Sequence, residues 1–249
     1  MIVDVLMYLL LGAAMGTLGG LFGIGGGLVA IPALGVLFGL DQQLAQGTAL
    51  LMVLPNVLLA LWRYNQRNRI SVRNAMMLIG PSFFVSWLTS LWAVRIDAMS
   101  MRVGFVGFLV VLTLFNLIQM YWRKGNADAQ LRHSKWLWVL GVGSGVTAGM
   151  FGVGGGVIAT PILTGVFGAT QVVAQGLALA LAAPATVITL TTYAFHGHVD
   201  WLMGIALAIG GLASISWGVA LAHSLPERLL RSLFCVFLVL CAIMLCFRI

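Results

Sequence analysis

The chain has 249 residues, of which 61% are hydrophobic and 8% are charged. Soluble domains carry about a quarter charged residues, so this composition excludes a soluble globule with a wetted surface. Thirteen basic and six acidic residues give a net charge of +7. The basic residues lie between apolar stretches, as in the cytoplasmic loops of membrane proteins, so nucleic-acid binding is not expected.

Apolar stretches cover most of the chain, and a helix needs about 20 such residues to cross a bilayer. We therefore expect an all-α, polytopic transmembrane helical bundle. In chain order the stretches span residues 5–40, 44–62, 75–94, 103–122, 136–169, 172–195, 201–225 and 233–247.

The first stretch lacks a basic leader and continues in apolar sequence beyond a cluster of glycines, so it is interpreted as mature protein and not as a secretory signal. Dense glycine destabilises a helix and admits backbone conformations closed to other residues. The sequence therefore predicts that the backbone unwinds at this cluster, which is followed by Pro32. The glycines are Gly23, Gly25, Gly26 and Gly27.

The chain resembles itself when it is shifted by 129 residues. Residues 20–55 align without a gap with residues 149–184, with 18 identities in 36 positions. We predict two homologous halves: a first transmembrane repeat at 1–122, a polar cytoplasmic linker at 123–135 and a second transmembrane repeat at 136–249. The alignment also pairs Tyr64 with Tyr193.

The second half repeats the glycine cluster before Pro161, so a second helix break is expected there. Secondary transporters built from two repeats bind substrate near the bilayer midplane, where interrupted helices meet. Unpaired N–H groups at a helix start, together with the helix dipole, attract anions. The predicted site therefore includes both clusters, the second of which consists of Gly152, Gly154, Gly155 and Gly156.

Other glycine patterns favour packing. Glycines at intervals of four residues let membrane helices approach closely, and we assign the two such series to helix contacts. The GxGxxA pattern within GGGLVA and GGGVIA lacks the strand and acidic residue of a dinucleotide fold. The series are Gly12, Gly16 and Gly20, and Gly141, Gly145 and Gly149.

Paired segments of the form GxxxGLFGIGGGxxxxP, followed by AQGTAL or AQGLAL, resemble the sulfite exporter family TauE/SafE. The later HGHVDW and LPERLLRSLF segments are also similar to that family. The resemblance spans nearly the whole chain. It implies a permease of a bacterial cytoplasmic membrane for sulfite, sulfonates or other small organic anions, driven by an ion gradient.

Two glutamines occupy equivalent positions, and each precedes a glycine: Gln46 and Gln175. Their amides can donate to a sulfonate or carboxylate oxygen, but interhelical hydrogen bonding is an equal alternative. Thr48 and Asn56 add donors to the first half, where the second half has Leu and Ala. Hydroxyls in membrane helices often bond their own backbone instead.

Ionisable and metal-binding groups are sparse. His196, His198 and Asp200 form a cluster that suggests either proton coupling or, with greater weight, a solvated turn. The cysteines in the last apolar stretch show neither a CxxC pair nor nearby histidines, so we expect no metal, cofactor or disulfide. They are Cys235, Cys241 and Cys246.

Two topologies remain open. If each glycine-broken region is a hairpin, each half has five segments, the chain has ten, and the repeats are inverted. If each region crosses once, the chain has eight crossings and the repeats are parallel. We favour hairpins, because residues 26–39 are too short and residues 5–39 too long for one crossing at 1.5 Å per residue.

The leading hypothesis is a secondary transporter of a small sulfur-containing or carboxylic anion, working by alternating access with a proton or sodium gradient. A passive anion channel is the alternative. A membrane-embedded enzyme is less favoured, because it needs convergent ionisable residues at membrane depth. The sequence contains no Walker motif, so ATP is not expected to be the direct energy source. The sequence leaves the exact anion, the direction of transport and the oligomeric state open.

Overall fold

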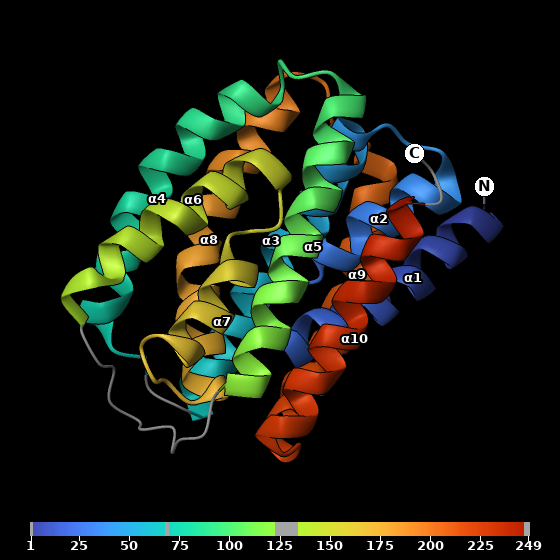
Figure 1. The fold of residues 1–249 in the computed structure, drawn as a ribbon. Helices are drawn as coiled ribbons and strands as arrows, with labels where there is room; N and C mark the ends of the chain where they lie inside the picture. Colours follow the sequence, from blue (N-terminus) through green and yellow to red (C-terminus); the bar gives the residue numbers. More distant parts are fainter. Residues whose placement is uncertain (1, 68–69, 123–133, 247–249) are drawn as a thin grey trace.

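The computed structural model describes residues 2–67, 70–122 and 134–246, and this part of the chain forms ten α-helices and one 3₁₀ turn (Figure 1). The predicted linker falls outside the described residues, apart from Ser134 and Lys135. The elements are α1 Ile2–Phe22, α2 Gly27–Phe38, α3 Gln42–Arg67, α4 Val72–Ala93, α5 Ala98–Trp122, η1 Ser134–Trp136, α6 Leu137–Phe151, α7 Gly156–Gly165, α8 Gln171–Phe195, α9 Trp201–Ser224 and α10 Glu227–Cys246.

Six of these helices are long and apolar enough to cross a membrane: α1, α3, α4, α5, α8 and α9. Their outward side chains are large and apolar, with Trp92, Phe195 and Trp217 among the most exposed. A soluble protein rarely exposes so much apolar surface, whereas lipid accommodates it. The prediction of an all-helical, multi-pass membrane protein is confirmed.

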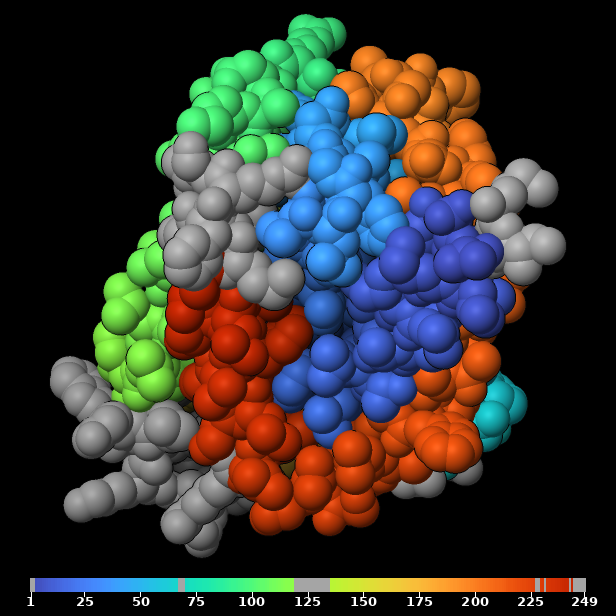
Figure 2. Space-filling view, turned by 90° about the vertical axis from the view of Figure 1, so that its right-hand side faces the viewer, coloured from blue at the N-terminus to red at the C-terminus, as the bar shows by residue number. Residues whose placement is uncertain are grey.

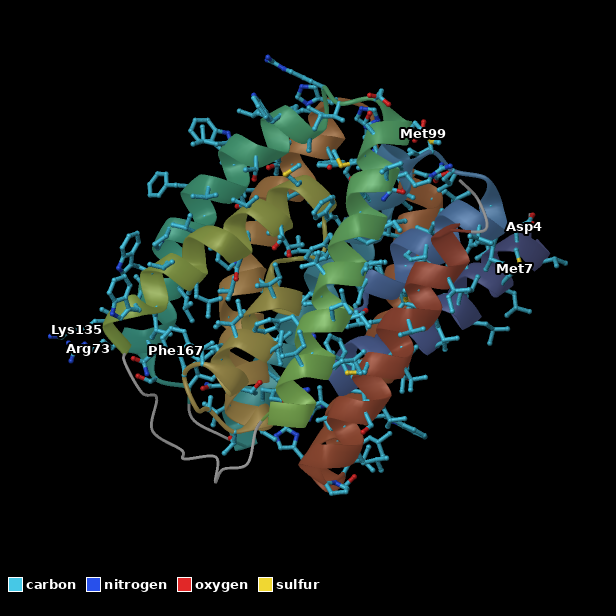
Figure 3. All side chains as sticks on the ribbon, viewed as in Figure 1. Asp4, Met7, Arg73, Met99, Lys135 and Phe167 are labelled. Carbon is cyan, nitrogen blue, oxygen red and sulfur yellow. The ribbon has the colours of Figure 1, made fainter. Side chains whose placement is uncertain are left out.

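Each glycine-broken region folds back on itself as a helical hairpin. The ring of Tyr8, near the start of α1, packs against Phe38 at the end of α2 with 5.2 Å between centroids. In the second region, Lys135 before α6 and Phe167 after α7 lie at the same end of the molecule (Figure 3). The hairpins agree with the five-segment interpretation, while the sidedness of the halves stays a prediction.

The helices of the two predicted halves exchange partners. Helix α1 packs mainly on α9, and α6 packs mainly on α4. The glycine series form these contacts, as predicted: a Cβ placed on Gly16 would lie 2.5 Å from Gly211 of α9, and one on Gly145 would lie 2.8 Å from the carbonyl oxygen of Ser82 in α4. The small residues are needed because the backbones nearly touch.

Two hydrophobic cores reflect this exchange. One core joins α4, α6, α7 and the first half of α8, with Leu78, Leu140, Leu163 and Leu181 among its buried residues. The larger core joins α1, α2, α3, α5, α9 and α10 with α8 from Leu179 onward and with single residues of α4, α6 and α7. On the face seen in Figure 2, the blue helices α1 and α2 lie beside the red helix α10.

Candidate functional site

The first helix break lies where the glycine cluster predicted it. Helix α1 ends at Phe22 and α2 begins at Gly27. Between them, Gly23, Gly25 and Gly26 have φ angles of 68°, 71° and 94°, in the left-handed region that L side chains rarely adopt. Gly26 is the N-cap of α2, and no side chain caps this helix.

The second break has the same geometry. Helix α6 ends at Phe151 and α7 begins at Gly156. Gly152, Gly154 and Gly155 have φ angles of 67°, 72° and 70°. Gly155 is the N-cap of α7, again without a side-chain cap. The first N–H groups of both short helices therefore lie inside the molecule, next to the glycines of the breaks.

The two breaks are in contact with each other. A Cβ placed on Gly27 would lie 3.4 Å from the carbonyl oxygen of Gly152 and 3.7 Å from the Cα of Val153. These backbone segments are 125 residues apart in the sequence, counted from Gly27 to Gly152. The glycines that the sequence assigned to the site are thus brought together from both halves.

The paired glutamines are buried and bridge the halves. The Tyr64 hydroxyl donates to Gln175 Oε1 at 2.7 Å, and the Tyr193 hydroxyl donates to Gln46 Oε1 at 2.8 Å. Each tyrosine hydroxyl also lies 3.2 Å from a carbonyl oxygen near the end of a broken helix, that of Gly20 or Met150. The interhelical hydrogen bonding offered as one interpretation of the glutamines is present.

Each glutamine lies against the break of the opposite half. A Cβ on Gly23 would lie 2.7 Å from the Gln175 side chain, and a Cβ on Gly152 would lie 3.4 Å from Cβ of Gln46. The remaining amide groups differ: Gln175 Nε2 donates to the Leu21 carbonyl oxygen at 3.2 Å, whereas Gln46 Nε2 has no partner within the described residues.

Two hydroxyl groups near the second break were not singled out from the sequence. Thr186 Oγ1 lies 3.1 Å from a Cβ placed on Gly154, and the Ser144 backbone carbonyl lies 2.7 Å from one on Gly155. Both side chains are fully buried, and neither hydroxyl has a partner among the described residues. In the self-alignment both residues are polar where the first half has apolar residues, so a search for such unlike pairs finds them.

The other polar candidates lie outside the contact between the two breaks. Thr48 Oγ1 accepts a hydrogen bond from the Asp200 N–H at 2.9 Å, so it anchors the start of α9. Asp200 Oδ1 in turn caps α9 by accepting from the Met203 N–H at 3.0 Å. Asn56 is buried against Gly211 of α9, and His196 Nδ1 lies 2.8 Å from the Thr192 carbonyl oxygen.

Comparison with known proteins places the sequence of this chain in a family. The sequence profile of the sulfite exporter TauE/SafE family matches residues 8–245. A probable membrane transporter protein of Xylella fastidiosa strain 9a5c is 26% identical over 247 residues, which cover 96% of this chain and 92% of that protein.

Two further relatives carry similar names. The probable membrane transporter protein YunE of Bacillus subtilis strain 168 is 23% identical, covering 92% of this chain and 93% of its own. A probable membrane transporter protein of Methanocaldococcus jannaschii is 27% identical over 163 residues, 63% of this chain and 60% of that protein. These names describe transporters and not enzymes. The chain belongs to the sulfite exporter TauE/SafE family and is a multi-pass membrane transporter.

Proposed function

We propose that this transporter moves a small anion, such as sulfite, a sulfonate or a short carboxylate, by alternating access around the two helix breaks. The observation that carries the proposal is the contact between the breaks, where Gly27 and Gly152 meet. Discontinuous helices whose ends meet at the bilayer midplane are the usual binding sites of secondary transporters. The name of the family, sulfite exporter, supports the choice of sulfite as the first probe.

The physical basis of anion binding is the pair of uncapped helix starts at Gly27 and Gly156. The first N–H groups of a helix have no intrahelical partner, and the helix dipole places partial positive charge there. Such a terminus binds an anion without a charged side chain. The break segments 23–27 and 152–156 contain no charged residue.

The proposed site joins the glycines of both breaks with the glutamines of α3 and α8. An export or import cycle needs energy, and the proposal assigns it to a proton or sodium gradient. The partners are therefore a small anion, a coupling cation and the lipid bilayer, which for this protein is proposed to be a bacterial cytoplasmic membrane.

Flux in proteoliposomes tests the proposed function. Purified protein is reconstituted and sulfite uptake is measured under an imposed proton gradient, an imposed sodium gradient or neither, with protein-free liposomes as the control. We expect saturable uptake that exceeds equilibrium when one gradient is present. Flux that neither saturates nor responds to a countergradient would indicate a passive channel instead.

A panel of anions tests which substrate the protein binds, independently of how the substrate is transported. Sulfite, thiosulfate, methanesulfonate and acetate are each tested for their effect on the melting temperature of the purified protein, because a ligand that binds only the folded state raises its stability. If no panel anion is bound and none is transported under any gradient, the proposed function is wrong.

A further inference from the structure

The two breaks have different side-chain surroundings although their backbones match. At the first break, Met15 and Val57 occupy the positions equivalent to Ser144 and Thr186 at the second, each 129 residues earlier. The Val57 Cγ2 faces Gly25, and the Met15 carbonyl oxygen lies 2.8 Å from a Cβ placed on Gly26. At these two positions the first break therefore has apolar residues where the second has hydroxyl groups.

Both polar atoms of the glutamine at the first break have a hydrogen-bond partner. Gln175 accepts from the Tyr64 hydroxyl at 2.7 Å and donates to the Leu21 carbonyl oxygen at 3.2 Å. These bonds tie α8 to the end of α1 just before the break. Gln175 therefore has the contacts of a residue that holds helices together.

The second break gathers buried donors without partners. Gln46 Nε2, Ser144 Oγ and Thr186 Oγ1 are inaccessible to solvent and have no hydrogen-bond partner within the part of the chain that the structure describes. All three residues are fully buried. An unpaired buried donor costs stability, and a native protein that keeps several in one place usually has a ligand or a function for them.

The residues that carry these donors lie on three helices around the second break. Gln46 lies on α3 beside Gly152, Thr186 lies on α8 beside Gly154, and Ser144 lies on α6, whose backbone covers Gly155. The N-terminus of α7 completes the surroundings, because it starts at Gly156 without a side-chain cap. Several donors around one break match an anion that carries more than one acceptor oxygen.

We propose that the anion site is asymmetric: Gln46, Ser144 and Thr186, with the N-terminus of α7, bind an oxyanion at the second break, and the first break is structural. This inference rests on the proposed function and narrows its site to one of the two breaks. Other buried polar atoms without partners in the described residues are on Gln42, Asn56 and Ser82, and none of these residues is among those that face the glycines of the second break. Asn56 faces Gly211, and Ser82 faces Gly145.

Replacement of Thr186 by valine tests the placement. Thr186→Val removes the hydroxyl with little change in shape and reproduces the first break, where Val57 stands. Sulfite binding to the purified full-length protein is measured by titration of its melting temperature. We expect the apparent affinity for sulfite to fall about tenfold, the effect of losing one hydrogen bond to a charged group. Ser144→Ala should weaken it similarly.

The melting temperature without sulfite separates a binding role from a structural one. Removing an unpaired buried hydroxyl should leave it unchanged or raise it. Thr189→Val is the matched control on the same helix, because the Thr189 hydroxyl already donates to the Ala185 carbonyl oxygen at 2.8 Å. Its sulfite affinity should equal that of the wild type.

Three outcomes overturn the placement. If Thr186→Val and Ser144→Ala both bind sulfite as the wild type does, the second break is not the site, although the proposed function stands. If Thr189→Val loses affinity equally, the effect is not specific to the break. If the wild type binds and transports none of the panel anions, the proposed function and the placement fail together.

Discussion

At the residue scale, Gln46 and Gln175 occupy equivalent positions but have different partners. Both accept a hydrogen bond from a tyrosine of the opposite half, and within the described part of the chain only Gln175 also donates, to the Leu21 carbonyl oxygen. The spare amide of Gln46 lies at the second break, beside Gly152. We therefore propose that the same residue type has a structural role in one half and a binding role in the other.

Substitution of each glutamine by leucine should separate these roles. Gln175→Leu breaks two hydrogen bonds and Gln46→Leu breaks one, so we expect Gln175→Leu to lower the free energy of unfolding by about 1 kcal/mol more. Gln46→Leu should lose more of the melting-temperature increase that sulfite produces. Melting curves with and without sulfite measure both effects, and each variant serves as the control for the other. A larger loss of stability in Gln46→Leu would contradict the assignment.

The sequence indicated these residues without indicating their contacts. The self-alignment pairs Tyr64 with Tyr193 and Gln46 with Gln175, but an alignment of repeats identifies equivalent positions and not neighbours. The bonds run between non-equivalent residues of opposite halves, because α3 and α8 pack together. Ser144 and Thr186 were missed because hydroxyls in membrane helices commonly bond their own backbone.

At the element scale, the glycine clusters determine where the helices end. A residue with φ near +70° costs an L side chain about 1–3 kcal/mol, so helices stop where glycines allow the turn. This local rule made the breaks predictable from sequence, and the structure confirms their positions. The regular glycine spacing likewise predicted close helix contacts, although it did not identify which helices form them.

Two adjacent glycines of the second break provide a matched comparison. Gly155 has φ of 70°, and a Cβ on it would lie 2.7 Å from the Ser144 carbonyl oxygen; Gly156 is helical, and its nearest atom would be the Ala178 carbonyl oxygen at 3.3 Å. We expect Gly155→Ala to destabilise the protein by about 1–3 kcal/mol from backbone strain alone. Gly156→Ala should have a smaller effect, because alanine favours a helix. Equal melting temperatures for the two variants would show that the left-handed turn is not required.

At the scale of the whole molecule, basic residues mark one end of the bundle. Arg73 and Lys135 lie together at one end, and Met99 lies at the opposite end (Figure 3). The hairpin interpretation of the sequence divides the Lys and Arg residues ten to three between the two sides. The positive-inside rule then assigns the end with Arg73 to the cytoplasm.

Labelling of single cysteines tests this orientation. In a variant without native cysteines, Arg73→Cys and Met99→Cys are treated separately in intact cells with a membrane-impermeant maleimide; both native side chains are exposed. Met99→Cys should be labelled at once, and Arg73→Cys only after the cells are permeabilised. The cysteine-free parent controls for background. The reverse pattern would invert the proposed orientation.

The exchange of helix partners changes which parts of the molecule can rock against each other. Two homologous halves could move as units, but α4 of the first half packs on α6 and α8 of the second and shares a core with them. Separating the halves would open this core and the α1–α9 contact. We infer that the moving bodies are mixed, with α4, α6, α7 and α8 forming one of them.

A disulfide between α4 and α8 distinguishes mixed bodies from rocking halves. Ser90 Oγ donates to Thr192 Oγ1 at 3.1 Å across this contact, so Ser90→Cys with Thr192→Cys in a cysteine-free background should cross-link on oxidation. If α4 and α8 move together, oxidised and reduced protein should transport sulfite into proteoliposomes at the same rate. If the halves move as units, the disulfide joins the moving parts, and oxidation should stop uptake that reduction restores.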